Sequence, residues 1–286
     1  MIIITGTGRS GTSLVSQLAD RVGLDFGPRD RLIDSDDLNT EGYFESRQMV
    51  ALNTRLIVGS SRAVELEIMP GRRPGPAQHL LRIPSMLNYL LRMYLLPMRP
   101  SALHRHEQRF ARDIADAAEA HRNIAVKDPR FSATLGTWRN HVEIDRILYC
   151  FRHPRAAAES LKRARGFPIW LGNWILQNRI QSFLNHAQDI PCTVVEFERF
   201  FDPQTRLDEI RRLYDFADTV YDPRHATALL DEVVKPGMRH FQSSVMPTEG
   251  PARTLHELLQ SLHAEHAEPR PFPAIDIPTA LSQKPH

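Results

Sequence analysis

The first nineteen residues place the strongest constraint on the fold of this chain. Residues 1–5, Met-Ile-Ile-Ile-Thr, form a short apolar run rich in β-branched side chains, which is typical of a buried strand. A glycine-rich turn follows over residues 6–13, and Leu14 and Leu18 then share one face of a predicted helix. Glycines let a backbone wrap around an anion, and a helix start offers unpaired N–H groups and partial positive charge. The stretch therefore predicts a phosphate-binding strand, loop and helix.

The turn is close to a Walker A loop but departs from it at one position. Gly6 and Gly11 occupy the glycine positions of G-x-x-x-x-G-K-[ST], and Ser13 fits the last position. Thr12 stands where that pattern requires the lysine that reaches the β- and γ-phosphates. The cation of this loop is instead Arg9, so ATP or GTP chemistry has little support in the sequence.

Strands and helices alternate along the rest of the chain. Helical spacing is seen over residues 47–58, 102–121, 156–164, 170–186 and 208–216, and strand-like runs over 22–27, 124–126, 145–151 and 192–197. This alternation indicates βαβ units and predicts an α/β fold, a three-layer arrangement of a parallel sheet flanked by helices, as in P-loop NTPases. Sites in such sheets lie at the carboxyl ends of the strands.

The length of 286 residues suits one such domain. We expect a single domain over residues 1–268 with a helical insertion over about 59–121, followed by a weakly ordered, proline-rich tail over 269–286. Within the insertion, residues 79–98 are rich in Leu and Met and are a candidate wall or lid for an acceptor pocket. A core helix or an oligomer contact is the alternative for this stretch.

Composition excludes some classes of function. The 36 Lys and Arg residues against 34 Asp and Glu residues leave a net charge of +2, so we expect no nucleic-acid partner. The two cysteines, Cys150 and Cys192, lie in apolar runs and are expected to be buried and reduced. The chain has no uninterrupted run of about 18 apolar residues, so we expect no transmembrane segment and a cytoplasmic protein. A homodimer is left open.

Two motifs resemble those of sulfotransferases that use 3′-phosphoadenylyl sulfate (PAPS). Residues 9–13, Arg-Ser-Gly-Thr-Ser, are similar to the 5′-phosphosulfate loop of that family, [KR]-[ST]-G-[ST]-[ST]. Arg152 ends a predicted strand, Pro154 suits the first turn of the next helix, and Ser160 lies eight positions after Arg152, as in the family's 3′-phosphate motif. The resemblance implies that PAPS is bound by Thr7, Gly8, Arg9, Ser10, Gly11, Thr12, Ser13, Arg152 and Ser160.

The resemblance extends from residue 1 to about 241 and suggests catalytic residues. Lys127, in Lys-Asp-Pro, matches a lysine of the tyrosylprotein branch that stabilises charge on the transferring sulfuryl group, a role shared with Arg9. A general base is needed for the acceptor hydroxyl; we favour Glu45 and keep Asp30 as the alternative. The segment 234–240 loosely resembles a loop that closes over the nucleotide, through Lys235 and Arg239.

The implied function is a transferase: a PAPS-dependent sulfotransferase that moves a sulfuryl group in line to a hydroxyl or amine. We expect no metal, and a small-molecule or lipid-like acceptor. One alternative is a P-loop kinase or NTPase with a degenerate Walker A loop, for which Asp128 is the candidate Mg²⁺ ligand. Another alternative is a non-catalytic nucleotide-binding protein.

Overall fold

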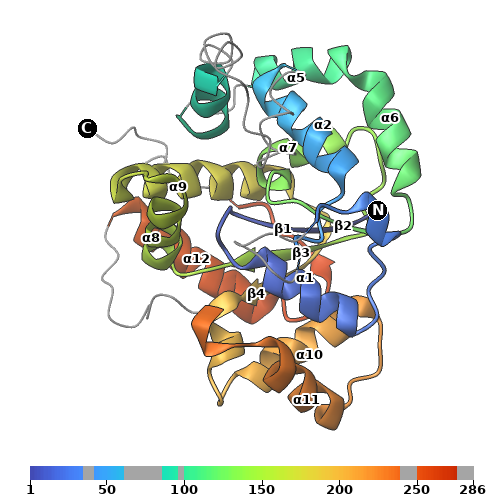
Figure 1. The fold of residues 1–286 in the computed structure, drawn as a ribbon, viewed down its shortest axis with the longest axis vertical. Coiled ribbons are helices and arrows are strands. Elements are labelled where there is room, and N and C mark those ends of the chain that lie inside the picture. Colours follow the sequence, from blue (N-terminus) through green and yellow to red (C-terminus); the bar gives the residue numbers. More distant parts are fainter. Residues whose placement is uncertain (35–41, 61–85, 96–99, 239–249, 276–286) are drawn as a thin grey trace.

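A central five-stranded sheet organises the computed structural model, which describes residues 1–34, 42–60, 86–95, 100–238 and 250–275 (Figure 1). The strands follow the order β2-β1-β3-β4-β5; β1 to β4 are parallel and β5 pairs antiparallel with β4. Their bounds are β1 Ile2–Gly6, β2 Ala125–Lys127, β3 Arg146–Phe151, β4 Pro191–Glu196 and β5 Arg270–Pro271. The predicted α/β class is confirmed.

Helices cover both faces of the sheet because successive strand residues point to opposite sides. Ile4, Leu148 and Val195 point into the core on one face, which is covered by α1 Thr12–Arg21, α10 Arg206–Ala217 and α11 Pro223–Val233. Ile3 and Tyr149 point to the other face. That face is covered by α2 Arg47–Val58, α6 Ala111–Ala120, α7 Phe131–Trp138, α9 Ile169–His186 and α12 Pro251–Glu265. The result is the predicted three-layer arrangement (Figure 1).

The register of the sheet brings three predicted motifs to one edge. Ile4 on β1 is level with Lys127 on β2, and Gly6 is level with Cys150 on β3. Arg152 comes directly after β3 and is followed by α8, Pro154–Arg165. Because these strands are parallel, their carboxyl ends meet, which is where ligands bind in open α/β sheets.

Some predicted elements differ from the structure. Residues 22–27 form no strand, although Leu24 and Phe26 are buried in the core beside α1. The helix predicted over 102–121 is two helices, α5 Pro100–Arg109 and α6, and the buried Phe110 lies between them. Helices α7, α11 and α12 were not predicted. Tertiary burial decides the backbone of residues 22–27 and the break at Phe110. Helices α11 and α12, by contrast, bury residues at helical spacing, a signal that the sequence analysis did not use.

The expectation of weak order from residue 269 is wrong for the first part of the tail. Arg270–Pro271 forms β5, the amide of Phe272 donates to the carbonyl of Ile190 at 3.0 Å, and the Phe272 side chain is 1% exposed. Its ring packs edge-on against Phe183, with ring centroids 5.7 Å apart. Burying one large aromatic ring is enough to fix a short segment against the core.

Part of the predicted insertion is described. Residues 86–95 are helical and end in η3, Leu91–Leu95, with Tyr89 and Met93 buried against the end of α2 and against Ala133. Residues 61–85 and 96–99 lie outside the described residues, so the insertion and single-domain boundaries stay predictions. None of the described helices combines the length and apolar character needed to cross a membrane.

Candidate active site

The loop after β1 depends on two glycines that allow close approaches. A Cβ on Gly6 would lie 2.1 Å from the carbonyl oxygen of Cys150. Gly11, the N-cap of α1, has a φ of 92°, and a Cβ there would lie 2.0 Å from Cδ2 of Phe197. A Cβ on Gly8, by contrast, would have nothing within 4 Å among the described residues. The loop is therefore held tightly at both ends and open in the middle, as a cradle for a ligand requires.

We expect Gly11→Ala to destabilise the protein by at least about 2 kcal/mol, because it adds a left-handed penalty to a steric overlap with Phe197. Gly8→Ala is the matched control and should change stability by less than about 1 kcal/mol. Urea unfolding of the two variants measures this difference. Equal stability of both would contradict the geometry described for Gly11.

The start of α1 presents polar groups that suit an anion. The N-cap, Gly11, makes no side-chain hydrogen bond to the first turn, which leaves the amides of that turn for another acceptor. The hydroxyl of Ser10 is fully buried and has no hydrogen-bond partner among the described residues. A buried hydroxyl without a partner is costly, so this group indicates a ligand site. An oxyanion at the loop would satisfy both features.

Arg152 presents a second group for an anion, at the end of β3, the strand that pairs with β1. Its side chain is largely buried, Nε donates to Oε1 of Glu198 at 3.3 Å, and the guanidinium lies 4.6 Å from the centroid of the Phe197 ring. Nη2 of Arg152 is buried without a hydrogen-bond partner among the described residues. A guanidinium fixed on one side and unpaired on the other is suited to bind phosphate.

Burial and ion pairing have opposite effects on the pKa values of Glu198 and Arg152. Burial raises the pKa of Glu198, and Arg152 together with the backbone amide of His153 lowers it. Burial also lowers the pKa of Arg152, which Glu198 opposes. An additional negative charge at Nη2 would therefore stabilise the charged form of Arg152 further.

The two predicted motifs meet directly. Nε of Arg9, in the loop after β1, donates to Oγ of Ser160 on α8 at 3.0 Å. Ser160 is buried, whereas Arg9 has a left-handed backbone, with a φ of 71°, and an exposed position. The structure thus brings the loop and the Arg152–Ser160 segment to one site.

Lys127 and Glu45 form a buried ion pair beside the same loop. Nζ of Lys127, whose residue is 1% exposed, donates to Oε1 of Glu45 at 2.6 Å. The same ammonium donates to Oγ of Ser13 and to the carbonyl oxygen of Tyr43, each at 3.1 Å. Lys127 is therefore a buried lysine whose paired carboxylate is that of Glu45.

Local backbone geometry directs Glu45 into the site. Phe44 has a φ of 55°, and its buried ring packs edge-on against Phe26 with centroids 5.3 Å apart. The amide of Ile33 donates to the carbonyl of Glu45 at 2.8 Å, and Ser46 then caps α2 by accepting from the amide of Met49. Because Phe44 turns into the core, the next side chain, Glu45, points to Lys127.

Asp30, Lys235 and Arg239 were also predicted as site residues. Asp30 is exposed on η1, Arg29–Arg31, and among the described acids it is Glu45 that contacts Lys127. Lys235 is exposed after α11, and its ammonium donates to the carbonyl of Asp231 at 3.0 Å. Arg239 lies outside the described residues.

Sequence reasoning assigned no site role to Asn53, Arg130 or Glu198. Asn53 is fully buried on α2, between apolar residues at helical spacing, and a polar residue in such a position was the one available signal. Glu198 and Arg130 carry no motif signal, because charged residues are usually solvated.

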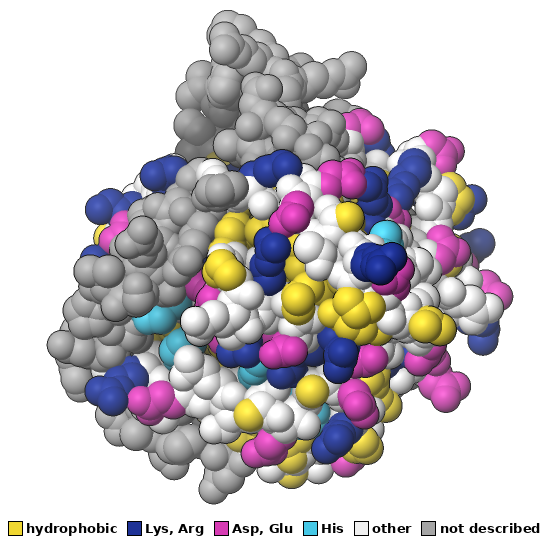
Figure 2. Space-filling view, turned by 90° about the horizontal axis from the view of Figure 1, so that it is seen from below, with side chains coloured by type: hydrophobic (Ala, Val, Ile, Leu, Met, Phe, Trp, Pro, Cys, Tyr) yellow, Lys and Arg dark blue, Asp and Glu magenta, His cyan; other side chains and the backbone are white. Residues whose placement is uncertain are grey.

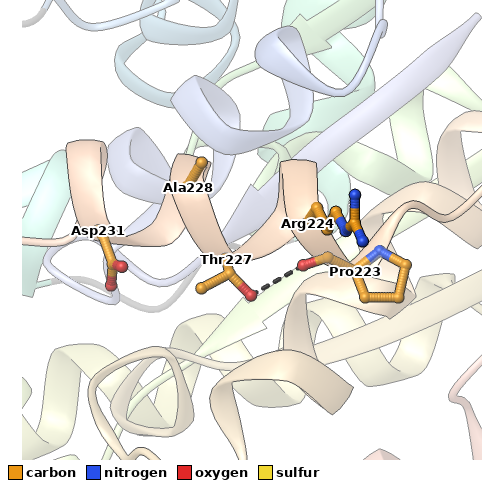
Figure 3. Close-up of a pocket in the computed structure, with 5 residues that line it drawn as sticks. All are labelled: Pro223, Arg224, Thr227, Ala228 and Asp231. Atoms are coloured by element: carbon orange, nitrogen blue, oxygen red, sulfur yellow. Dashed lines mark hydrogen bonds between the residues drawn. The ribbon is translucent and has the colours of Figure 1, made fainter.

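A shallow hollow of about 560 Å³ lies on the outer side of α11, away from these residues (Figure 3). Its lining comes from that one helix: Pro223, Arg224, Thr227, Ala228 and Asp231. Thr227 donates to the carbonyl of Pro223, and Asp231 pairs with Arg206 at 2.8 Å. Figure 2 shows basic and acidic side chains intermixed over the face seen from below. The hollow contains none of the predicted site residues.

The sheet order and the motifs at its carboxyl edge define an α/β protein with a candidate anion site. Among solved structures, the chain is similar to the sulfotransferase domain of the olefin synthase from Synechococcus PCC 7002. The TM-score is 0.51 at 17% sequence identity, and the match covers 97% of this chain and 95% of that chain. No protein-family model matches the chain, and no curated protein matches it by sequence. The likeness shows that the chain has the fold of a sulfotransferase domain.

Proposed function

We propose that this protein is a sulfotransferase that takes its sulfuryl group from PAPS and transfers it to a hydroxyl or amine. The observation that carries the proposal is the hydrogen bond between Arg9 and Ser160, which brings together the two motifs that we predict to bind anions. A donor with a 5′-phosphosulfate and a 3′-phosphate needs two such motifs close together. The sulfotransferase fold of the chain supports the same conclusion.

The polar groups of the site fit the two anionic ends of this donor. The buried hydroxyl of Ser10 and the first turn of α1 would bind the 5′-phosphosulfate end. Nη2 of Arg152 and the hydroxyl of Ser160 would bind the 3′-phosphate. Arg9 belongs to the loop and donates to Ser160, so its charge would be available to the bridging oxygen.

The chemistry follows from the Glu45–Lys127 pair. The acceptor oxygen forms a bond to sulfur as the bond between sulfur and the bridging phosphate oxygen breaks, and the electron pair leaves with adenosine 3′,5′-bisphosphate. The carboxylate of Glu45 accepts the proton of the acceptor hydroxyl. Lys127 and Arg9 neutralise the charge on the sulfuryl and bridging oxygens.

The stretch 79–98 remains our candidate acceptor wall. Within its described part, Met86 and Leu87 are exposed apolar side chains, which suits a small-molecule or lipid-like acceptor.

The kinase alternative is less favoured by the surroundings of Asp128. Its carboxylate is fully buried and already accepts from Nδ2 of Asn53 at 2.8 Å and from the amide and Nη1 of Arg130, each at 2.9 Å. Burial and Glu45 raise the pKa of Asp128 to about 8, although these hydrogen bonds oppose the shift. A carboxyl group so enclosed is a poor Mg²⁺ ligand. A nucleotide-binding protein without turnover remains an outcome of the test below.

The test is release of adenosine 3′,5′-bisphosphate from PAPS in the presence of a panel of phenols, alcohols and amines. We expect acceptor-dependent release that Mg²⁺ does not stimulate. Binding of PAPS with no turnover on any acceptor would support the binding-only alternative. Stabilisation by ATP and Mg²⁺ but not by adenosine 3′,5′-bisphosphate would refute the proposal.

We expect Arg152→Ala to weaken binding of adenosine 3′,5′-bisphosphate by on the order of 1.5–3 kcal/mol, because one charge-assisted hydrogen bond to the 3′-phosphate is lost. The same change should barely alter binding of 5′-AMP, which has no 3′-phosphate. Calorimetric titration of both nucleotides checks the difference. Arg155→Ala is the matched control, since Arg155 lies in the first turn of α8, pairs with Glu159 and has a side chain that is 41% exposed. Equal losses for the two nucleotides would remove the basis for a separate 3′-phosphate site.

A further inference from the structure

Glu45 is held by a cation on each of its two carboxylate oxygens. Oε1 accepts from Nζ of Lys127 at 2.6 Å, and Oε2 lies 3.6 Å from Nη1 of Arg130. The Arg130 side chain is 14% exposed, so the contact is shielded from much of the solvent. Glu45 therefore has two buried cationic partners that differ in chemistry, an ammonium and a guanidinium.

The two cations differ in how firmly they are anchored. Arg130 begins the turn into α7, and both its amide and its Nη1 donate to Oδ1 of Asp128 at 2.9 Å. Lys127 is a point charge on a flexible stem, and its other partners are a hydroxyl and a carbonyl, on Ser13 and Tyr43. Arg130 therefore binds one carboxylate oxygen through two of its groups, whereas each partner of Lys127 is held by a single hydrogen bond.

A buried amide completes the anchor of Arg130. Nδ2 of Asn53 donates to Oδ2 of Asp128 at 2.8 Å, opposite the oxygen that accepts from Arg130. Oδ1 of Asn53 in turn accepts from Oγ1 of Thr134 at 2.8 Å and from Nε1 of Trp138 at 2.7 Å. The orientation of the amide is thus set from both ends, and Asp128 cannot rotate without losing buried hydrogen bonds.

The charged form of Arg130 depends on its ion pair with Glu45. Burial lowers the pKa of Arg130, Glu45 raises it, and the guanidinium of Arg165 on α8 lowers it further. The pairing with Glu45 therefore opposes both burial and a like charge. Arg130 is held where an unpaired arginine would be unfavourable.

We infer that Arg130 is a positioning residue, anchored by Asp128 and Asn53, that holds Glu45 in place when Lys127 turns to the sulfuryl group of the donor. The inference rests on the proposed function. In the donor-free protein Lys127 pairs with Glu45, so the sulfuryl group competes with Glu45 for Lys127. Arg130 lowers the cost of that exchange because it keeps a positive partner on Glu45. Adenosine 3′,5′-bisphosphate lacks the sulfuryl group and does not take part in this competition.

The experiment compares the affinities for PAPS and for adenosine 3′,5′-bisphosphate, measured by calorimetry without an acceptor. Arg130→Gln should weaken PAPS binding by about 3- to 10-fold and change binding of the product nucleotide by less than about 2-fold. Glu45→Gln should instead strengthen PAPS binding by a similar factor. In Glu45→Gln, the further change Arg130→Gln should have no effect, because the charge through which Arg130 acts is gone.

Arg139→Gln is the matched control, since Arg139 follows the other end of α7 and donates to the carbonyl of His186 at 2.8 Å. It should bind both ligands like the parent. We expect Arg130→Gln to fold, because Asp128 keeps its hydrogen bonds from the backbone amide of residue 130 and from Asn53. If that variant does not fold, Arg130→Lys, which retains the charge but not the two-point contact, should still weaken PAPS binding selectively.

Four results would overturn the inference. Parallel losses for both ligands would mean that Arg130 binds the nucleotide itself. An effect of Arg130→Gln that persists in Glu45→Gln would mean that Arg130 acts independently of Glu45. Unchanged PAPS binding in Arg130→Gln would refute the inference alone, whereas a parent protein that binds neither ligand would refute the proposed function and the inference together.

Discussion

Glu45→Gln should reduce sulfuryl transfer by about 10²- to 10⁴-fold, because the amide cannot accept the proton of the acceptor. The carboxylate lies 2.6 Å from the ammonium of Lys127 and beside the loop after β1, where the proposed transfer needs a general base. The amide oxygen can still accept from Lys127, so we expect the fold to be retained. The measurement is the initial rate of transfer to the best acceptor of the panel, with nucleotide-dependent thermal stabilisation as the test of folding.

Asp30→Asn is the matched control for this prediction. Asp30 is the other acid that the sequence proposed as general base, and the structure places it exposed on η1. We expect its transfer rate to stay within about 3-fold of the parent, as for most exposed substitutions. An active Glu45→Gln together with an inactive Asp30→Asn would reverse the assignment.

Lys127→Met should be the second most damaging change, with a loss of transfer of about 10²- to 10³-fold. The ammonium is the buried cation nearest to Glu45 and to the hydroxyl of Ser13, so its removal takes away stabilisation of the charge on the sulfuryl oxygens. Methionine matches the apolar stem of lysine and limits any change in packing. Breaking a buried pair also costs stability, typically about 3–5 kcal/mol, although Arg130 remains next to Glu45.

Two measurements separate the catalytic loss from the loss of stability. Transfer is measured well below the unfolding temperature of the variant, and binding of adenosine 3′,5′-bisphosphate shows that the site is intact. Lys162→Met, an exposed lysine on α8, should retain parental rates. Undiminished transfer by a folded Lys127→Met would exclude Lys127 from the charge-stabilising role.

The local elements of the site were predictable from the sequence because each depends on neighbouring residues. An apolar run, two glycines and a helical period are enough to define β1, the loop and α1, and the structure has these elements at Ile2–Gly6 and Thr12–Arg21. The spacing from Arg152 to Ser160 likewise places both residues around one strand end and one helix. The order of strands and helices was sufficient to predict the α/β class.

Tertiary structure decided the features that depend on residues distant in the chain. Arg9 and Ser160 are 151 positions apart, and Lys127 and Glu45 are 82 apart. Their contacts require the register that sets Ile4 level with Lys127 and the turn at Phe44 that directs Glu45 inward. The register and the turn cannot be predicted from the spacing of apolar residues, because both follow from packing of the whole sheet against its helices.

The sequence by itself therefore determined the class of fold, the strand, glycine-rich loop and helix at its start, and the kinds of residue available at the carboxyl ends of the strands. The tertiary structure decided which of those residues meet: Glu45 rather than Asp30 at Lys127, and Arg130 held by Asp128 and Asn53. The physical reason is that backbone propensity acts over a few residues. A buried charge is stabilised by whichever partners the folded core brings within hydrogen-bonding distance.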